Sequence, residues 1–231
     1  MKIAVCISGL WRNVTPDCMK LYNRTREVFS DADFYYHTWD KHLHKIPESI
    51  RSSVLTSPEP VLNYHPVYSV DRWNKNNKFF TYRSKIINKE KMSHASKQIL
   101  AHAYLVDNLK EEYDIIIRTR WDVVVSDKID YSKIYDMVLS RGPVGAMNRT
   151  TSKDNKDIYV IQEEISSNNS WYGYLPDAII FHTPKHFDTK RVYKLHEDKE
   201  LWAAEWGWYQ VMSEPYGDIH TSLRGGVLVA T

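Results

Sequence analysis

The sequence predicts an α/β protein whose helices flank a mostly parallel central sheet. An apolar run, residues 2–9, opens the chain and ends at a glycine, which is typical of a buried parallel strand that leads into a tight turn. A helix signal and a second strand, residues 32–39, follow within the first forty residues, and this β-α-β order is the unit of a parallel sheet. The 231 residues, 42% of them hydrophobic, suit a single domain.

Local signals place the other elements in order. Thr15-Pro16-Asp17 marks the start of the first helix, with proline at a position that helices favour. A long helix is expected within residues 91–113, where apolar residues recur at helical spacing. The later elements are expected as a strand over 113–125, a helix over 130–141, a short strand over 142–147, polar loops over 149–175, a strand over 177–183 and a mostly helical region over 185–212.

Bulk properties narrow the class of protein. A net charge of +2 does not by itself predict a polyanionic partner. The two cysteines, Cys6 and Cys18, do not make a disulfide framework, and Cys6 is expected to be buried in the first strand. No stretch reaches the roughly 18 apolar residues of a membrane span, and the N-terminal apolar run is too short for a signal peptide. We therefore expect a soluble cytoplasmic protein.

The strand expected over residues 113–125 carries three charged residues near its exit. Arg118, Arg120 and Asp122 occupy alternate positions and would share one face of a continuous strand. In parallel α/β sheets, ligands bind outside the carboxyl ends of the strands. Two guanidiniums suit a diphosphate, and a carboxylate suits a divalent metal or a sugar hydroxyl. A buried Arg–Asp pair with a purely structural role is the alternative.

Three segments together carry a resemblance to a known family. The segments "ISGLWR" (7–12), "YYHTWD" (35–40) and "YDIIIRTRWD" (113–122) resemble those of small GT-A-type nucleotide-sugar glycosyltransferases, whose relatives occur in surface-polysaccharide clusters and in tailed phages. The resemblance implies one Rossmann-like GT-A domain over 1–231. Its nucleotide-sugar-binding half would be 1–125, and its acceptor-binding half would be 126–231.

The resemblance also implies a set of donor-binding residues. The first loop would lie near the donor diphosphate, and the second strand would line the nucleotide. The implied donor-binding residues are Ser8, Gly9, Arg12, His37, Trp39, Asp40, Arg118 and Arg120.

The expected metal motif departs from the family pattern. Asp122 stands where GT-A enzymes place the metal-binding Asp-x-Asp, but position 120 is Arg. With His220 as a second ligand, a Mn or Mg ion is one possibility. Replacement of some of the metal's charge by Arg118 and Arg120 is the other.

The glycosyl-transfer reaction determines which catalytic groups the enzyme would need. Negative charge grows on the leaving diphosphate, and an inverting enzyme needs a carboxylate to take the acceptor proton. The implied catalytic residues are Asp122, Asp177 and Glu205. An exposed helix charge is the alternative for Glu205, and a solvated loop side chain is the alternative for His220.

A local basic segment bears on the acceptor. Residues 72–97 contain eight Lys and Arg residues against one acid, interleaved with aromatic residues, which is a pattern expected for nucleic-acid binding. The candidate acceptor-binding residues are Arg72, Trp73, Lys75, Lys78, Arg83 and Lys85. Phage enzymes that resemble this family glycosylate hydroxymethylated cytosine in DNA, so this base is the leading expectation, and the location would then be the host cytoplasm. The alternatives are a surface-polysaccharide or lipid-linked glycan acceptor, and a merely solvated surface.

Other classes explain less of the sequence. A non-catalytic DNA-binding protein stays open, but it does not account for the charged residues at the strand exit. A zinc hydrolase is disfavoured because there is no His-Glu-x-x-His, and Pro184 separates His182 from His186. A Rossmann oxidoreductase is disfavoured because the first turn lacks G-x-G-x-x-G.

Overall fold

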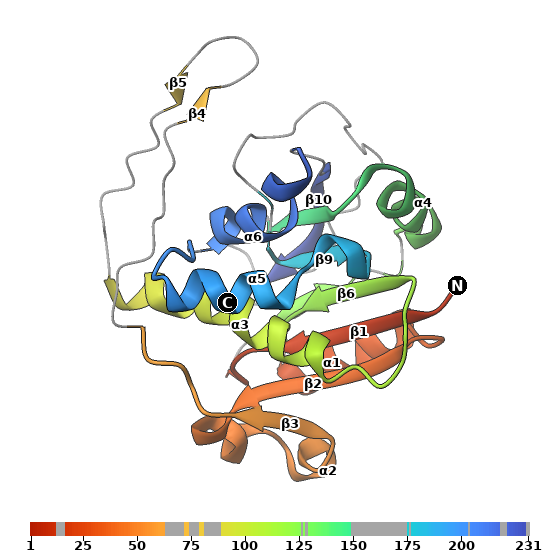
Figure 1. Cartoon of the computed structure of the whole chain (residues 1–231). Helices are drawn as coiled ribbons and strands as arrows, with labels where there is room; N and C mark the ends of the chain where they lie inside the picture. The colour runs from red at the N-terminus through yellow and green to blue at the C-terminus, as the bar shows by residue number, and fades with distance from the viewer. Residues whose placement is uncertain are drawn as a thin grey trace.

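The computed structural model describes residues 1–12, 17–62, 72–73, 79–80, 89–125, 127, 129–148, 175, 177–202, 204–217 and 221–229. Within these residues, eight strands form one sheet in the order β3-β2-β1-β6-β9-β8-β10-β7 (Figure 1). The strands are β1 (Ile3–Ser8), β2 (Asp33–Trp39), β3 (Val54–Ser57), β6 (Ile115–Thr119), β7 (Val123–Val125), β8 (Val144–Asn148), β9 (Ile179–His182) and β10 (Thr221–Val229). A separate two-stranded ladder pairs β4 (Arg72–Trp73) with β5 (Phe79–Phe80).

Strand direction confirms the predicted mostly parallel sheet. The neighbours β3, β2, β1 and β6 all run parallel to one another. The strand β9 is antiparallel to both β6 and β8, and β7 is antiparallel to β10. The four parallel strands on one side of the sheet therefore end at a common edge, where ligands bind in folds of this class.

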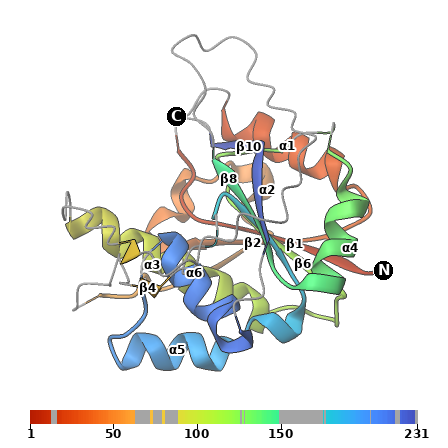
Figure 2. The same ribbon diagram turned by 90° about the horizontal axis from the view of Figure 1, so that it is seen from above.

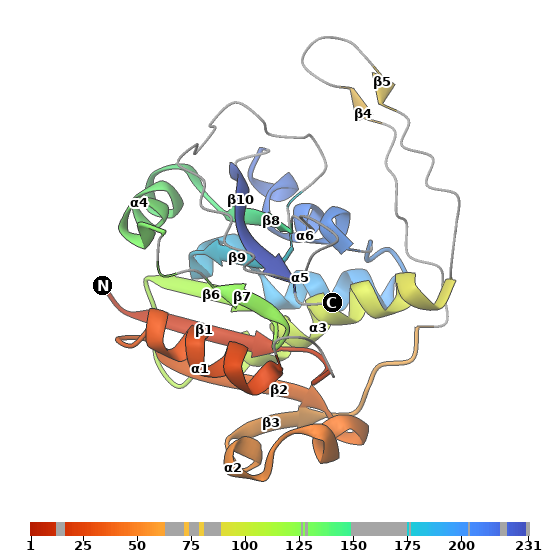
Figure 3. The same ribbon diagram turned by 180° about the vertical axis from the view of Figure 1, so that it is seen from behind.

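Helices cover both faces of the sheet (Figure 2). They are α1 (Cys18–Val28), α2 (Glu48–Arg51), α3 (Lys89–Asp107), α4 (Tyr131–Arg141), α5 (Thr189–Glu197) and α6 (Ala204–Met212). Figure 3 shows α1 lying across β1 and β2, on the face opposite to α3. This three-layer arrangement is the α/β architecture that the β-α-β order of the sequence predicts.

Alternation along β1 divides the core between the two faces. Val5 and Ile7 belong to the cluster that includes α1 and α4 residues, whereas Ala4 and Cys6 pack with α3. All four side chains are at most 1% exposed. The expected burial of Cys6 is confirmed, and burial raises the pKa of its thiol. The sequence runs as a continuous apolar segment because both faces of this strand are covered.

The charged strand expected over 113–125 is two strands, which corrects the prediction. The first, β6, ends at Thr119, and a turn follows in which the Val123 amide donates to the Arg120 carbonyl at 3.4 Å. The second, β7, pairs with β10 at the edge of the sheet and not beside β1. The prediction that Arg120 and Asp122 share a strand face with Arg118 therefore does not hold, because both residues lie in the turn after β6.

Other boundaries show where local signals succeed and fail. The helix α1 begins at Cys18, two residues after the expected first helical position, Pro16. Asp17 is its N-cap, and the Asp17 carboxylate accepts from the Lys20 amide at 2.9 Å. The long helix α3 ends at Asp107, short of residue 113. The region 185–212 divides into α5 and α6, because Lys199 adopts a φ of +63° that a right-handed helix does not accept. The sequence analysis did not predict the strands β3 and β10.

Candidate active site

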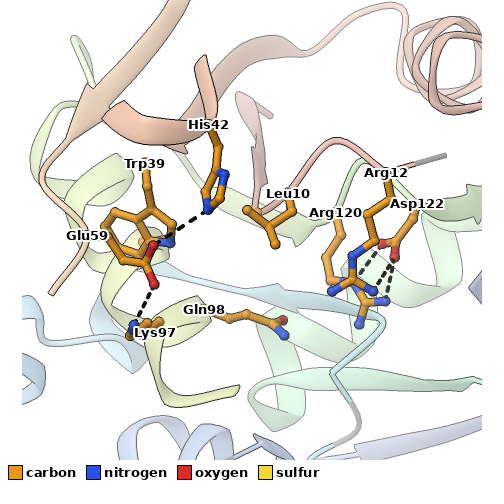
Figure 4. A pocket seen from close by; sticks show the side chains of 11 residues that line it. Leu10, Arg12, Trp39, His42, Glu59, Lys97, Gln98, Arg120 and Asp122 are labelled. Carbon is orange, nitrogen blue, oxygen red and sulfur yellow. Dashed lines mark hydrogen bonds and ion pairs between the residues drawn. The ribbon is translucent and has the colours of Figure 1, made fainter. Parts of the chain in front are cut away.

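A cleft that is partly open to solvent lies at the carboxyl ends of the four parallel strands. The loops after β1, β2, β3 and β6 form its walls together with one face of α3 (Figure 4). The lining residues are Gly9, Leu10, Arg12, Trp39, His42, Glu59, Lys97, Gln98, Ala101, Arg120 and Asp122.

The first loop of the cleft turns at Gly9. Its φ is +118°, a value that residues with a side chain rarely adopt. The Thr38 hydroxyl donates to the Gly9 carbonyl at 3.1 Å, which ties the end of β1 to the end of β2. Gly9 therefore directs the chain so that Arg12 reaches the cleft.

One end of the cleft is an arginine–carboxylate cluster. The carboxylate of Asp122 accepts from Arg120 through both oxygens, with Nε–Oδ1 at 2.8 Å and Nη2–Oδ2 at 3.1 Å. The Arg12 Nη1 lies 3.6 Å from Asp122 Oδ2. Burial acts to lower the pKa of Arg120, but the hydrogen bonds and charge of Asp122 outweigh it, so the pKa of Arg120 is raised. Arg120 therefore stays cationic.

Arg118 lies behind the cleft and has no exposed surface. Its guanidinium donates to the Asp177 carbonyl and to Gln98 Oε1, and it stacks 4.8 Å from the centre of the Trp208 ring. Burial lowers the pKa of Arg118 to about 10. The expectation that Arg118 contacts the donor is corrected, because this side chain is enclosed between β6, α3 and α6.

Two other expected donor-binding residues are buried in the same way. Ser8 is 1% exposed and His37 is fully buried. The Nε2 of His37 lies 2.9 Å from the Ser57 hydroxyl, which joins β2 to β3, and burial lowers the pKa of His37 to about 4. Both residues lie inside the protein at the strand ends. The expectation that Ser8 and His37 contact the donor directly is therefore also corrected.

The two expected catalytic carboxylates, Asp177 and Glu205, come close to the arginines. Burial is the largest influence on the pKa values of Arg118 and Arg120 and acts to lower both, whereas the charges of Asp177 and Glu205 act to raise them. Both acids are half-buried, and the Glu205 carbonyl accepts from the Leu175 amide at 3.1 Å. The fold thus gathers Asp177 and Glu205 near Arg120 although they lie far apart in the sequence.

The opposite end of the cleft holds Glu59, which the sequence analysis did not identify. Its side chain is 7% exposed and pairs with Lys97 Nζ at 2.5 Å and with Lys41 Nζ at 2.6 Å. His42 Nε2 lies 3.6 Å away. Burial acts to raise the pKa of Glu59, but the two lysines outweigh it and the pKa is lowered. The only signal was its place after β3, a strand that was itself not predicted.

The remaining donor-, acceptor- and metal-binding candidates either lie at the edge of the cleft or lie where the structure does not describe their side chains. Trp39 lines the cleft as expected, whereas Asp40 is exposed and lines a neighbouring hollow with Glu59 and Lys97. The structure describes the backbone of Arg72 and Trp73 but not their side chains. The other candidates for acceptor or metal binding lie outside the described residues: Lys75, Lys78, Arg83, Lys85 and His220.

The described residues do not fit the expected metal centre. Among them, no group of three or more His, Cys, Asp or Glu side chains is placed to hold a metal ion. Both carboxylate oxygens of Asp122 accept hydrogen bonds from Arg120. A lone carboxylate already bound by a guanidinium is a poor ligand for Mn or Mg, which take several oxygen ligands. Over the same described part of the chain, every helix is too short or too polar to span a bilayer.

Comparison with solved structures identifies the fold. The chain is similar to a 4-diphosphocytidyl-2C-methyl-D-erythritol synthase from Anaerococcus prevotii, with a TM-score of 0.50 at 9% identity over 97% of this chain and 87% of that one. A putative glucose-1-phosphate thymidylyltransferase from Bacillus anthracis gives a TM-score of 0.45 at 12% identity, over 98% and 88% of the two chains.

The glycosyltransferase GlyE of Streptococcus pneumoniae gives a TM-score of 0.42 at 14% identity, and the match covers 96% of this chain but 45% of that one. No family model matches the sequence, and the search of curated proteins gives no significant match. The α/β fold of the chain is GT-A-like, as the resemblance in the sequence implied.

Proposed function

We propose that the protein is a nucleotide-sugar-dependent glycosyltransferase. One observation carries this proposal: cationic side chains from separate elements line one cleft at the carboxyl ends of four neighbouring parallel strands. Arg12, Arg120 and Lys97 all line this cleft, and the carboxylates of Asp122 and Glu59 hold them in place. A cleft of this kind suits a ligand with a diphosphate and several hydroxyl groups.

The cleft also agrees with the proposed division of the chain. Every lining residue lies within residues 1–125, the proposed nucleotide-sugar-binding half. Asp177 and Glu205 come from the proposed acceptor-binding half and approach the cleft from the side of Arg120. Donor and acceptor would then meet next to Arg120.

In the proposed reaction, guanidinium groups stabilise the leaving diphosphate. Their N–H donors are fixed before the reaction by Asp122, so that little reorganisation is needed as negative charge develops. Asp177 and Glu205 are the two candidates for the base that accepts the proton of the acceptor hydroxyl. Both are half-buried, so a bound acceptor could reach their carboxylates.

A screen of nucleotide sugars tests this function directly. We expect slow release of nucleoside diphosphate from one donor class, and a decrease of at least about tenfold in the Arg120→Gln variant. The matched control is Arg141→Gln, because Arg141 is an exposed arginine at the end of α4. Failure of every nucleotide sugar to bind or react would contradict the proposal, as would turnover of nucleoside triphosphates with sugar phosphates instead.

The proposal also extends to the chemical class of the acceptor. We propose a hydroxyl acceptor, with hydroxymethylated cytosine in phage DNA as the first candidate and a polysaccharide or lipid-linked glycan as the second. The support for DNA is the basic, aromatic segment over 72–97 of the sequence. A cytoplasmic location remains a prediction.

Electrophoretic mobility shifts with duplex DNA over a salt series test the DNA acceptor. If the basic segment grips phosphates, the shift is strong at low salt and weakens steeply as the salt concentration rises. Simultaneous substitution of Lys75 and Lys78 by Gln should reduce the salt dependence. No shift at low salt would contradict the DNA acceptor and leave the glycan, whereas a shift without donor binding would favour a non-catalytic DNA-binding protein.

A further inference from the structure

The cluster around Asp122 differs from a metal site in how its charges are arranged. A site built on Asp-x-Asp would present two carboxylates to the cleft, whereas here position 120 supplies a guanidinium that covers the carboxylate of Asp122. The side chain of Asp122 is 4% exposed, compared with 17% for Arg120 and 54% for Arg12. The carboxylate is thus enclosed, and the cations form the accessible surface.

A divalent cation has little to bind at this position. The other carboxylate among the described lining residues, Glu59, lies at the opposite end beside Lys97 (Figure 4). It also pairs with Lys41. A cation that approached Asp122 would have to displace Arg120 from both oxygens, and it would meet the positive charges of Arg12 and Arg120. The positive charges of a metal ion and of the two arginines repel each other in this partly buried cleft. Binding of a metal ion at Asp122 is therefore incompatible with the observed positions of Arg12 and Arg120.

The arginine pair can perform the task of a metal. A guanidinium has five N–H donors in a fixed plane, and Arg120 uses Nε and Nη2 for Asp122. This attachment orients Arg120 within the wall of the cleft, and Arg12 approaches the Oδ2 atom of the same carboxylate. Guanidiniums bind phosphate oxygens through paired hydrogen bonds, so Arg12 and Arg120 together offer a ready diphosphate site.

We propose that Arg12 and Arg120 neutralise the leaving diphosphate without a divalent metal, and that Asp122 is a positioning residue that aligns them. This inference rests on the proposed glycosyltransferase function. In the transfer step, the bond from the sugar C1 to the diphosphate oxygen breaks and its electron pair stays on that oxygen. The acceptor oxygen bonds to C1, and its proton passes to the carboxylate of Asp177 or Glu205. The charge on the diphosphate increases where the two guanidiniums lie.

Metal removal provides the first test on the full chain. With the donor found in the screen, we expect turnover and nucleoside diphosphate affinity in excess EDTA to stay within about twofold of their values in Mg²⁺ or Mn²⁺. A loss of about tenfold or more in EDTA that is restored by either ion would overturn the inference but leave the glycosyltransferase standing. Absence of both binding and turnover, with or without metal, would overturn the function together with the inference.

Three variants test the roles of the individual residues. Arg120→Gln and Arg12→Gln should each weaken binding of the nucleoside diphosphate by about tenfold or more, while Arg141→Gln leaves it unchanged. Asp122→Asn keeps the side-chain shape and one acceptor oxygen. It should weaken the same binding by a smaller factor without making it metal-dependent, and the melting temperature separates this effect from misfolding.

The Asp122 variant also distinguishes positioning from metal ligation. If Asp122 is a metal ligand, titration of wild-type protein with Mn²⁺ reveals a bound ion that Asp122→Asn loses. We expect no specific Mn²⁺ binding in either protein. A specific Mn²⁺ signal in the wild type that disappears in the variant would overturn the inference.

Discussion

At the scale of single residues, two charges that are buried in the described part of the chain have partners in place. Arg118 is fully enclosed but donates to a carbonyl and to an amide and stacks on an indole ring. Glu59 is nearly enclosed and holds two ammonium groups. Removing one member of such a pair leaves the other in a poorly solvated place, which costs more than the net value of the pair.

Glu59 provides a prediction about stability at this scale. Glu59→Gln keeps the volume but removes the charge, and the side chain of Lys97, which is 13% exposed, would keep its own charge without that partner. We expect a loss of roughly 1–3 kcal/mol in the free energy of unfolding, measured by urea denaturation. The control Glu48→Gln, at an exposed position in α2, should change it by less than about 0.5 kcal/mol. Equal effects of the two substitutions would contradict this account.

At the scale of the elements, one contact between a helix and the sheet is a buried polar pair. His102 of α3 and His182 of β9 are fully buried, with their Nε2 atoms 2.9 Å apart. The Thr183 carbonyl accepts from His182 Nδ1, so His182 Nε2 is the acceptor and His102 the donor. Phe187 and Trp208 pack against this pair, at 4.8 Å and 5.6 Å between their ring centres and that of His102. The pair can keep this hydrogen bond only while the His182 ring is neutral, because a protonated His182 would present a second N–H to the donor.

The histidine pair gives a prediction about pH. Burial lowers the pKa of His182 from 6.5 to about 4, so the unfolded chain takes up a proton at a higher pH than the folded one. The stability from the neutral ring is complete above pH 6.5 and is lost as the pH falls towards 4. From about pH 7.5 to pH 5 we expect His182 to account for a loss of about 2 kcal/mol of unfolding free energy. Urea denaturation at both pH values measures it.

A variant without the titrating ring provides the comparison for this pH dependence. His182→Gln keeps a hydrogen-bonding side chain but does not titrate. Its unfolding free energy should fall less steeply between the two pH values than that of the wild type, even if it is lower throughout. Parallel pH dependences in the two proteins would show that the His182 ring does not carry the effect.

The packing of α6 on α3 gives a second prediction at this scale. At Gly207, an added Cβ would lie 2.4 Å from the Trp202 carbonyl oxygen and 2.5 Å from Cδ1 of Ile99 in α3. Gly207→Ala should therefore lower the unfolding free energy by roughly 1–3 kcal/mol, although alanine is the better helix former. The exposed helix variant Lys194→Ala in α5 should have little effect. An increase in stability for Gly207→Ala would contradict the close approach of the two helices.

At the scale of the whole molecule, the cleft joins strands and helices that are distant in sequence. Its walls come from the loops after β1, β2, β3 and β6 and from α3. A ligand that contacts these elements binds only the folded chain, so binding stabilises the molecule as a unit.

Thermal unfolding with a nucleoside diphosphate tests this coupling. At a ligand concentration about 100 times Kd the gain is about 2.7 kcal/mol, which for a chain of this size raises Tm by roughly 5–10 °C. Arg120→Gln should show a smaller shift at the same ligand concentration, and Arg141→Gln should match the wild type. Equal shifts for all three proteins would indicate that the diphosphate binds elsewhere.

The sequence by itself determined the α/β class, the first helix to within two residues of its start, and the apolar strands β1 and β2, because their signals are local: periodicity, capping and continuous burial. It also pointed to Gly9, Arg12 and Arg120, which directly follow such strands and line the cleft. The tertiary structure alone decided that Arg118 turns inward, that a turn ends β6, and that Glu59 and Lys97 complete the site. These outcomes depend on how distant segments pack and on which group fills the space beside each charge, and no local pattern encodes that information.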